Sequence, residues 1–145
     1  MLRISKLTDY ATIILSYLAL APEKIQSATL IAKACHLGVP TVSKILKILT
    51  EAELVRSYRG MEGGYQLARD VKAITIADVV LAIEGKVAVT ECCSGTTCAL
   101  DSLCAVKENW QVINKVIIKA LAEVTLNDMI RPRLRDMLKV PGEVP

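Results

Sequence analysis

The sequence predicts a mainly α-helical fold in which one two-stranded hairpin interrupts a series of helices. Apolar residues recur at helical spacing in several segments, and Ser or Thr stands where most of these segments begin. Two short β-like runs at residues 54–58 and 65–68 flank a Gly-rich segment. The chain has 145 residues, and its 52% of hydrophobic and 23% of charged residues suit the packed core of one ordinary domain.

Three helices are predicted in the N-terminal half. The first covers about residues 4–20 and ends before Pro22, because proline cannot continue a helix. The second and third cover about residues 28–35 and 41–52, and Gly38 between them is expected to supply the positive φ that closes the second. Two short helices about a Gly-containing turn are typical of a helix-turn-helix. The hairpin that follows would be a wing, so the order of elements predicts a winged helix-turn-helix.

The C-terminal half is predicted to form a helix, a loop and a long helix. A capping box at residues 75–78 opens the first of these. A loop at residues 86–103 holds most of the five cysteines, and the longest helix covers about residues 104–124. A second capping box at residues 125–128 opens a short last helix, and the charged tail from Pro132 is expected to fray.

Positive charge is concentrated in the N-terminal half. The net charge is +3, and residues 1–70 carry nine Lys or Arg against six Asp or Glu, whereas residues 71–145 carry nine of each. With a helix-turn-helix, whose second helix enters the major groove, this excess predicts binding to double-stranded DNA. For the residues of the third helix, the alternative to DNA contact is an ordinary solvated helix face. For the residues of the hairpin, it is a plain tight turn. The candidate DNA-binding residues are Thr41, Ser43, Lys44, Lys47, Arg59 and Gly60.

The start of the chain superficially resembles a signal peptide, because basic residues precede an apolar run from Tyr10 to Ala21. Asp9 and the helical spacing of the apolar residues favour an amphipathic helix instead, and the run is too short to span a bilayer. We therefore expect a cytoplasmic protein, in which cysteines indicate metal or redox chemistry rather than disulfides.

Three cysteines stand at regular intervals in the predicted loop. Cys92, Cys98 and Cys104 are separated by five residues each time, whereas structural zinc sites usually pair cysteines two to four residues apart. Three thiolates on a flexible loop suit iron–sulfur ligation, with a fourth ligand from elsewhere. Cys35 is interpreted as a buried small hydrophobe, and Cys93 as a spare thiol or an alternative to Cys92.

An enzyme is not expected. The single histidine, His36, is next to Cys35 in the helix-turn-helix, and no Gly-rich nucleotide loop or carboxylate pair is present. No small-molecule substrate is therefore predicted. A zinc-stabilised interaction module that binds no DNA is the alternative from another class.

Several stretches resemble the IscR/NsrR-type winged-helix iron–sulfur regulators, the Rrf2 family, over essentially the full chain. They are Leu-Thr-Asp-Tyr-Ala at residues 7–11, Arg-Gly-Met-Glu-Gly-Gly-Tyr at residues 59–65, and the three evenly spaced cysteines. Residues 91–94 and 104–110 are most similar to the regulators found with SUF iron–sulfur assembly operons.

The resemblance implies a homodimer in which the cysteine loop of one protomer faces the first helix of its partner. Some members use a His three residues after the third cysteine as the fourth ligand, but that position is Lys107, whose ammonium cannot coordinate metal. Other members use an acidic residue of the partner's first helix, which matches Asp9. Asp9 is thus the expected ligand, with Glu91, Glu108 or Cys93 as alternatives, and [2Fe–2S] is favoured over [4Fe–4S].

The function implied by the resemblance is repression of iron–sulfur assembly (SUF) genes from a palindromic operator. A nitric oxide or redox sensor of the same family is the alternative. Residues 1–85 would form the winged-helix DNA-binding domain, residues 86–103 the cluster-binding loop, and residues 104–145 the dimerisation helix and tail. The long helix suits dimerisation because its apolar stripe is too wide for one small domain to cover: Val106, Trp110, Ile113, Val116, Ile117, Ala120, Leu121 and Val124.

Overall fold

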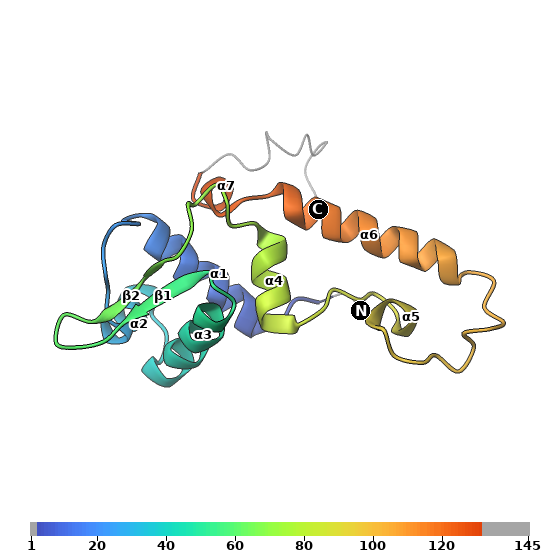
Figure 1. The fold of residues 1–145 in the computed structure, drawn as a ribbon, viewed down its shortest axis with the longest axis horizontal. Coiled ribbons are helices and arrows are strands. Elements are labelled where there is room, and N and C mark those ends of the chain that lie inside the picture. Colours follow the sequence, from blue (N-terminus) through green and yellow to red (C-terminus); the bar gives the residue numbers. More distant parts are fainter. Residues whose placement is uncertain (1–2, 132–145) are drawn as a thin grey trace.

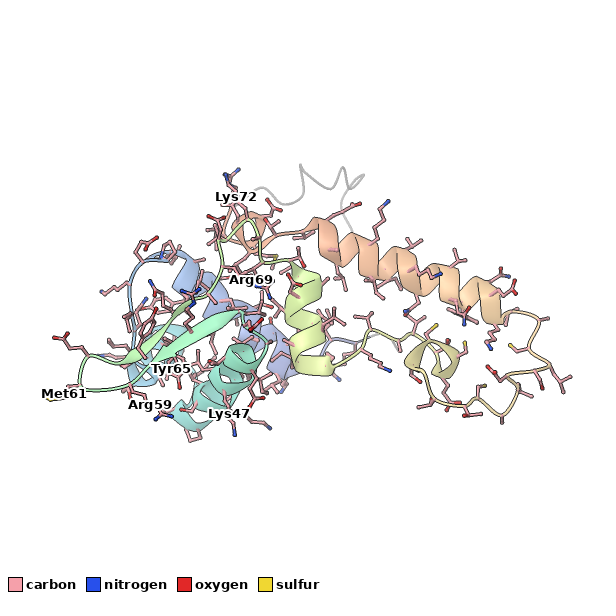
Figure 2. All side chains as sticks on the ribbon, in the orientation of Figure 1. Lys47, Arg59, Met61, Tyr65, Arg69 and Lys72 are labelled. Carbon is pink, nitrogen blue, oxygen red and sulfur yellow. The ribbon has the colours of Figure 1, made fainter. Side chains whose placement is uncertain are left out.

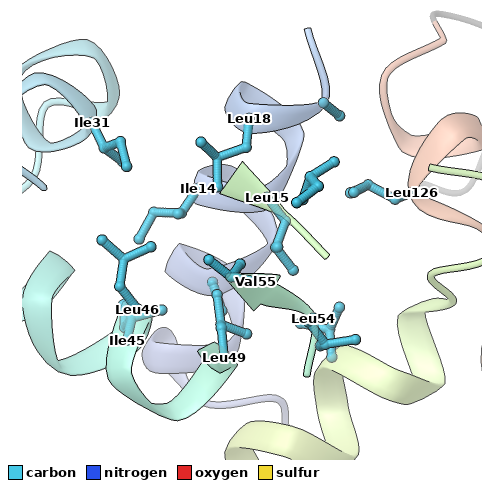
Figure 3. Packing of buried hydrophobic residues seen from close by; sticks show 14 of the residues in the cluster. Ile14, Leu15, Leu18, Ile31, Ile45, Leu46, Leu49, Leu54, Val55 and Leu126 are labelled. Carbon is cyan, nitrogen blue, oxygen red and sulfur yellow. The ribbon is translucent and has the colours of Figure 1, made fainter. Parts of the chain in front are cut away.

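Helix α1 (Lys6–Ala19) runs through the hydrophobic core of the computed structural model, which describes residues 3–131. Its side chains Ile14 and Leu15 are fully buried and share one cluster with Leu46 and Leu49 (Figure 3). The apolar spacing that predicted the first helix therefore also places that helix at the centre of the core.

The helix-turn-helix is formed by α2 (Ala28–Cys35) and α3 (Val39–Glu51). Helix α2 begins after Ser27, whose Oγ accepts a hydrogen bond from a backbone N–H in the first turn. Helix α3 begins at Val39 rather than at the predicted Thr41. Pro40 explains the earlier start, because a proline in the first turn of a helix sacrifices no hydrogen bond.

The turn between α2 and α3 corrects one expectation. Gly38 was expected to take the positive φ, but it has an extended conformation with φ of −68° and is the N-cap residue of α3. His36 takes the left-handed conformation instead, with φ of 56°, and closes α2. In a turn of only three residues, the left-handed position comes directly after the last helical residue, and Gly38 already belongs to the next helix.

The wing consists of antiparallel strands β1 (Val55–Tyr58) and β2 (Gly64–Leu67). Gln26, just before α2, adds one further bridge to β2, because its backbone N–H and C=O pair with those of Tyr65 at 2.9 and 2.8 Å. A Cβ at Gly64 would lie 2.4 Å from the Gln26 carbonyl oxygen, so this approach requires glycine. The wing is thus tied to the start of the helix-turn-helix.

The C-terminal part of the chain adds two helices to the core and one long helix that leaves the body, since Val79 and Leu126 belong to the core cluster. Helices α4 (Ile76–Glu84) and α7 (Leu126–Met129) open with the two predicted capping boxes. The long helix α6 (Lys107–Glu123) extends away from the body, and the short α5 (Glu91–Ser94) lies near its outer end (Figure 1). Helix α6 begins three residues later than predicted, and no side chain caps its start.

The predicted fold class is confirmed: the chain is mainly helical, with a two-stranded wing and a long C-terminal helix. Helix α5 is the one element that falls in the segment predicted to be a loop. No helix in the part that the structure describes is long and apolar enough to cross a membrane. The predicted fraying of the tail from Pro132 lies outside the described residues.

Candidate functional site

The outward face of α3 carries the first group of predicted site residues. The inward face is apolar and buried, as its spacing predicted. On the outward face Ser43, Lys44 and Lys47 are exposed, and Thr41 is half-buried. Hydroxyl and ammonium groups at these positions can donate hydrogen bonds to base edges and phosphates in a major groove.

The tip of the wing carries the second group. Arg59 and Gly60 are both exposed, and Gly60 has a φ of +103°. Figure 2 shows Arg59 and Lys47 on the same side of the molecule, whereas Lys72 lies on the opposite side. The wing and α3 therefore present cations to one side, as a duplex lying across both elements requires.

Two further exposed residues near the wing were missed by the sequence reasoning. Met61 stands at the hairpin tip with an exposed fraction of 106%. Arg56 on β1 is also exposed and lines, together with Arg69, a groove of about 710 Å³. The alternation of side chains along a strand could have placed Arg56 on the outer face. Met61 falls within the stretch at residues 59–65 that carries the resemblance, but its residue type alone does not distinguish it from an ordinary turn residue.

We call residues 86–106 the cysteine arm. Cys92, Cys98 and Cys104 all lie on it, and each is half-buried with a free thiol. Cys35 in α2 is also half-buried, and burial raises the pKa of its thiol. A raised pKa disfavours the thiolate, which agrees with the interpretation of Cys35 as a packing residue.

The start of the cysteine arm is bound to α6 by a side chain. Asn114 is the buried residue of α6. Its Oδ1 accepts a hydrogen bond from the Val89 N–H at 3.1 Å, and its Nδ2 donates to the Val87 carbonyl oxygen at 2.9 Å. The side-chain amide therefore pairs with the backbone of residues 87–89 in the way that a neighbouring strand would. The spacing of residues in the sequence gave no sign of this contact.

Thr90 connects the two adjacent cysteines. Its Oγ1 lies 3.1 Å from Cys92 Sγ and 3.3 Å from Cys93 Sγ. Cys93 Sγ also donates to the Trp110 carbonyl oxygen at 3.6 Å. Cys93 is thus directed at the first turns of α6 and has hydrogen-bonding partners of its own.

Lys107 lies near two of the predicted ligands. Its Nζ is 2.6 Å from Asp101 Oδ1. The hydrogen bond to Asp101 raises the pKa of the ammonium, and the thiolate charges of Cys92 and Cys104 raise it further. Cys92 and Cys104 therefore both lie near this ammonium, at the position where the resemblance would place a ligating His in some relatives.

The four predicted metal ligands do not meet within one chain. Over residues 3–131, no three His, Cys, Asp or Glu side chains are gathered closely enough to hold a metal ion. Asp9 lies on α1, exposed, in a groove of about 370 Å³ that Ile76 and Met129 also line. The donors still fit an iron–sulfur cluster in their chemistry, because three free thiols and a carboxylate are iron ligands.

Comparisons with known proteins agree with this architecture. The Rrf2 family model, described as "Iron-dependent Transcriptional regulator", matches residues 4–132. Protein aau3 of Rhizobium meliloti is 32% identical over 134 residues, which make up 91% of this chain and 87% of that protein. The HTH-type transcriptional regulator NsrR of Oceanobacillus iheyensis is 30% identical over 136 residues, which make up 90% of each protein.

Solved structures of similar proteins share the fold. CymR of B. subtilis, described as the global cysteine regulator, has a TM-score of 0.71 and 30% identity, covering 90% of this chain and 97% of that one. T. potens IscR has a TM-score of 0.69 and 28% identity, covering 99% and 94%. These matches identify the chain as a DNA-binding winged-helix regulator and not an enzyme. It belongs to the Rrf2 family of transcriptional regulators.

Proposed function

We propose that this regulator binds an iron–sulfur cluster and represses iron–sulfur assembly (SUF) genes from a palindromic operator. The observation that carries the proposal is the cysteine arm, with three free, half-buried thiols on one segment next to the start of α6. The description of the family as iron-dependent supports it. A role at the operator implies a cytoplasmic location.

The proposed assembly is a homodimer built on α6. The exposed fractions of Trp110, Ile113 and Val116 are 40, 43 and 61%, whereas the buried residue of this helix is the polar Asn114. An apolar face in water, on a helix that extends away from its own body, favours a second copy of the chain as its cover. A two-fold dimer would present two helix-turn-helix units to half-sites about 34 Å apart, or a multiple of that distance.

Each part of the chain has a proposed role in this assembly. Residues 1–85 bind DNA, residues 86–103 together with Cys104 hold the cluster, and residues 104–145 form the dimer. Thiolates of Cys92, Cys98 and Cys104 serve as ligands, and Asp9 of the partner subunit supplies the fourth. Contact with DNA is assigned to the predicted group: Thr41, Ser43, Lys44, Lys47, Arg59 and Gly60.

Regulation follows from a link between the cysteine arm and the partner's α1. When bound, the cluster, for which [2Fe–2S] is favoured, supplies a link that oxidation or iron loss can break. Lys107 places a positive charge near Cys92 and Cys104. Asp101 holds that ammonium in place at 2.6 Å. A coupling of about 1–3 kcal/mol between the arm and the DNA-binding face would change DNA affinity about 5–150-fold.

The second candidate function is sensing of nitric oxide or of redox state by the same ligands. Its support is the similarity to proteins named NsrR, of which the O. iheyensis protein is 30% identical. The two candidates share the cysteine arm and differ in the signal and in the genes controlled.

The test is anaerobic purification followed by assays of iron, sulfide and visible absorption. We expect a coloured protein that loses its cluster, or changes its spectrum, when Cys92, Cys98, Cys104 or Asp9 is replaced by Ala. Cys35→Ala is the matched control and should keep the wild-type spectrum, whereas a changed spectrum in Cys93→Ala would assign a ligand role to Cys93. A colourless protein that contains zinc would contradict the iron–sulfur cluster. Equal operator affinity of the metal-free and cluster-loaded proteins at matched salt would contradict the sensor.

A further inference from the structure

A carboxylate from α4 completes the N-terminal cap of α1. Ser5 is the N-cap residue of α1, and its Oγ accepts a hydrogen bond from the Thr8 N–H at 3.3 Å. Glu84 Oε1 accepts three hydrogen bonds from the same turn: one from the Ser5 N–H at 3.1 Å, and one each from the Ser5 and Thr8 hydroxyls at 2.5 Å. One carboxylate oxygen at the end of α4 therefore accepts hydrogen bonds from a backbone N–H and two hydroxyls at the start of α1.

This arrangement is a capping box whose acid comes from elsewhere in the chain. In a local capping box, an acidic or amide side chain three residues after the N-cap residue binds its N–H, as Asp78 and Asp128 do for α4 and α7. In α1 that position is Thr8, which has no carboxylate, and Glu84 takes the role. The first turn of α1 thus depends on the last residue of α4.

The position of Glu84 is unfavourable for its own helix. It is the last residue of α4, where the partial negative charge of a helix C-terminus repels a carboxylate. The N-terminus of α1 attracts the same carboxylate. Local helix energetics therefore do not account for an acid at residue 84, whereas the contact with α1 does.

Glu84 also lies between two parts of the proposed switch. Asp9, the candidate fourth ligand, directly follows Thr8 in the first turn of α1. Gly85 directly follows Glu84, has a φ of +81°, and precedes the cysteine arm. Glycine adopts this conformation without steric cost, so Gly85 itself does not fix the direction in which the chain leaves α4.

We propose that Glu84 is a positioning residue that couples the direction of the cysteine arm to α1. This inference rests on the proposed function, because the coupling carries the state of the cluster to the DNA-binding face. With the three hydrogen bonds in place, a change in the direction of the arm moves the first turn of α1 and Asp9. Helix α1 shares its core cluster with α3, so the movement reaches the DNA-binding helix.

The first test measures amide hydrogen exchange in the metal-free protein. Glu84→Ala should speed exchange about tenfold or more at the hydrogen-bonded amides of both segments, because each segment opens when the contact is lost. These amides are those of Ser5, Thr8 and Asp9 at the start of α1 and that of Val89 in the arm. Asp78→Ala, which removes the acid of the capping box at the other end of α4, is the matched control and should leave both segments unchanged. Wild-type protection of both segments in Glu84→Ala would overturn the proposal. If Glu84→Ala does not fold, Thr8→Val removes one of the donors, and the same two segments decide.

The second test compares operator affinity between the cluster-loaded and metal-free proteins. We expect a ratio of about 5 or more in the wild type to fall below about 2 in Glu84→Ala. The affinity of the metal-free variant should stay close to that of the wild type. An unchanged ratio in the variant would overturn the coupling role. If the cluster-loaded and metal-free wild-type proteins bind the operator equally well, the proposed sensor function is refuted. Hydrogen exchange would still decide whether Glu84 joins the arm to α1.

Discussion

The side-chain amide of Asn114 donates to the carbonyl oxygen of Val87 at 2.9 Å, across 27 positions of sequence. Together with the bond from the Val89 N–H, this contact fastens the cysteine arm to α6. Asn114→Leu would leave two backbone groups without a partner, so the free energy of unfolding should fall by about 1–3 kcal/mol, as measured by urea denaturation. Lys115→Leu, at the exposed neighbouring position, is the control and should change it by less than about 0.5 kcal/mol. Equal stabilities of the two variants would contradict the role of Asn114.

Gly64→Ala should loosen the wing from the helix-turn-helix. The new Cβ would lie 2.4 Å from the Gln26 carbonyl oxygen, so β2 must move away from Gln26. We expect a loss of about 1–3 kcal/mol in unfolding free energy, typical of overpacking, and weaker operator binding in a gel-shift assay. Gly38→Ala is the matched control, because the nearest atom to its Cβ, Pro40 Cδ, is 3.9 Å away. A folded Gly64→Ala protein with wild-type stability and affinity would show that the bridge to Gln26 is dispensable.

Lys47→Ala should weaken operator binding and reduce its dependence on salt. Each phosphate contact that is lost lowers the slope of log affinity against log salt by about 1. Lys72→Ala removes the same charge from the opposite side of the molecule and should leave the slope unchanged. Fluorescence anisotropy between about 50 and 200 mM salt measures both slopes. Identical slopes for the two variants would mean that α3 does not face the duplex.

Val116→Asp should separate the proposed dimer. The Val116 side chain is 61% exposed in the single chain, and a carboxylate there would be buried without a partner if α6 packs against a second copy. Sedimentation velocity should show a dimer for the wild type and a monomer for the variant. Lys119→Asp adds the same group at another exposed position of α6, outside the apolar stripe, and should stay dimeric. A monomeric wild type would refute dimerisation through α6.

Acid should weaken the contact between α4 and α1. The Ser5 hydroxyl, and then the Thr8 hydroxyl, hold the pKa of the Glu84 carboxyl below its ordinary value of 4.5. A carboxyl whose pKa is lower in the folded than in the unfolded chain adds stability above the unfolded value, and that stability is lost as pH falls through the folded value. Thermal midpoints of the wild type should therefore drop below about pH 4.5, and those of Glu84→Gln should drop less.

Asp128 provides a reference within the same titration. The Thr125 N–H and hydroxyl lower the pKa of its carboxyl, and this group is present in both proteins. Some acid sensitivity should thus persist in Glu84→Gln. Parallel curves for the wild type and Glu84→Gln would show that the Glu84 carboxylate adds no stability.

The elements with strong local signals were predicted well. Ser27 marks the start of α2, and the capping boxes at residues 75–78 and 125–128 mark those of α4 and α7. The Gly-rich segment at residues 59–64 marks the wing. These signals work because caps and turns are satisfied within a few residues. The wrong prediction at Gly38 also came from a local signal, because residue type alone suggested that glycine takes the left-handed conformation. The length of the turn places that conformation at His36 instead.

The arrangement of the site depends on contacts that sequence spacing does not reveal. Helix α5 has four residues and no side-chain cap, which is too short for a periodic pattern. Asn114 and Glu84 act on backbone or hydroxyl groups far away in the sequence, so neither forms a local motif. The proposed meeting of Asp9 with the cysteines needs a second chain, and its geometry is therefore not encoded in the spacing of one chain.

The cap that Glu84 supplies to α1 also affects the order in which the chain folds during synthesis. Thr8 and Glu84 are 76 positions apart, so at a translation rate of about 5–20 residues per second the first turn of α1 waits roughly 4–15 s for its acid. A nascent chain halted within the wing would contain all of α1, but the first turn of this helix would lack the Glu84 carboxylate that caps it. The segment made first on the ribosome is therefore among the last to reach its final form.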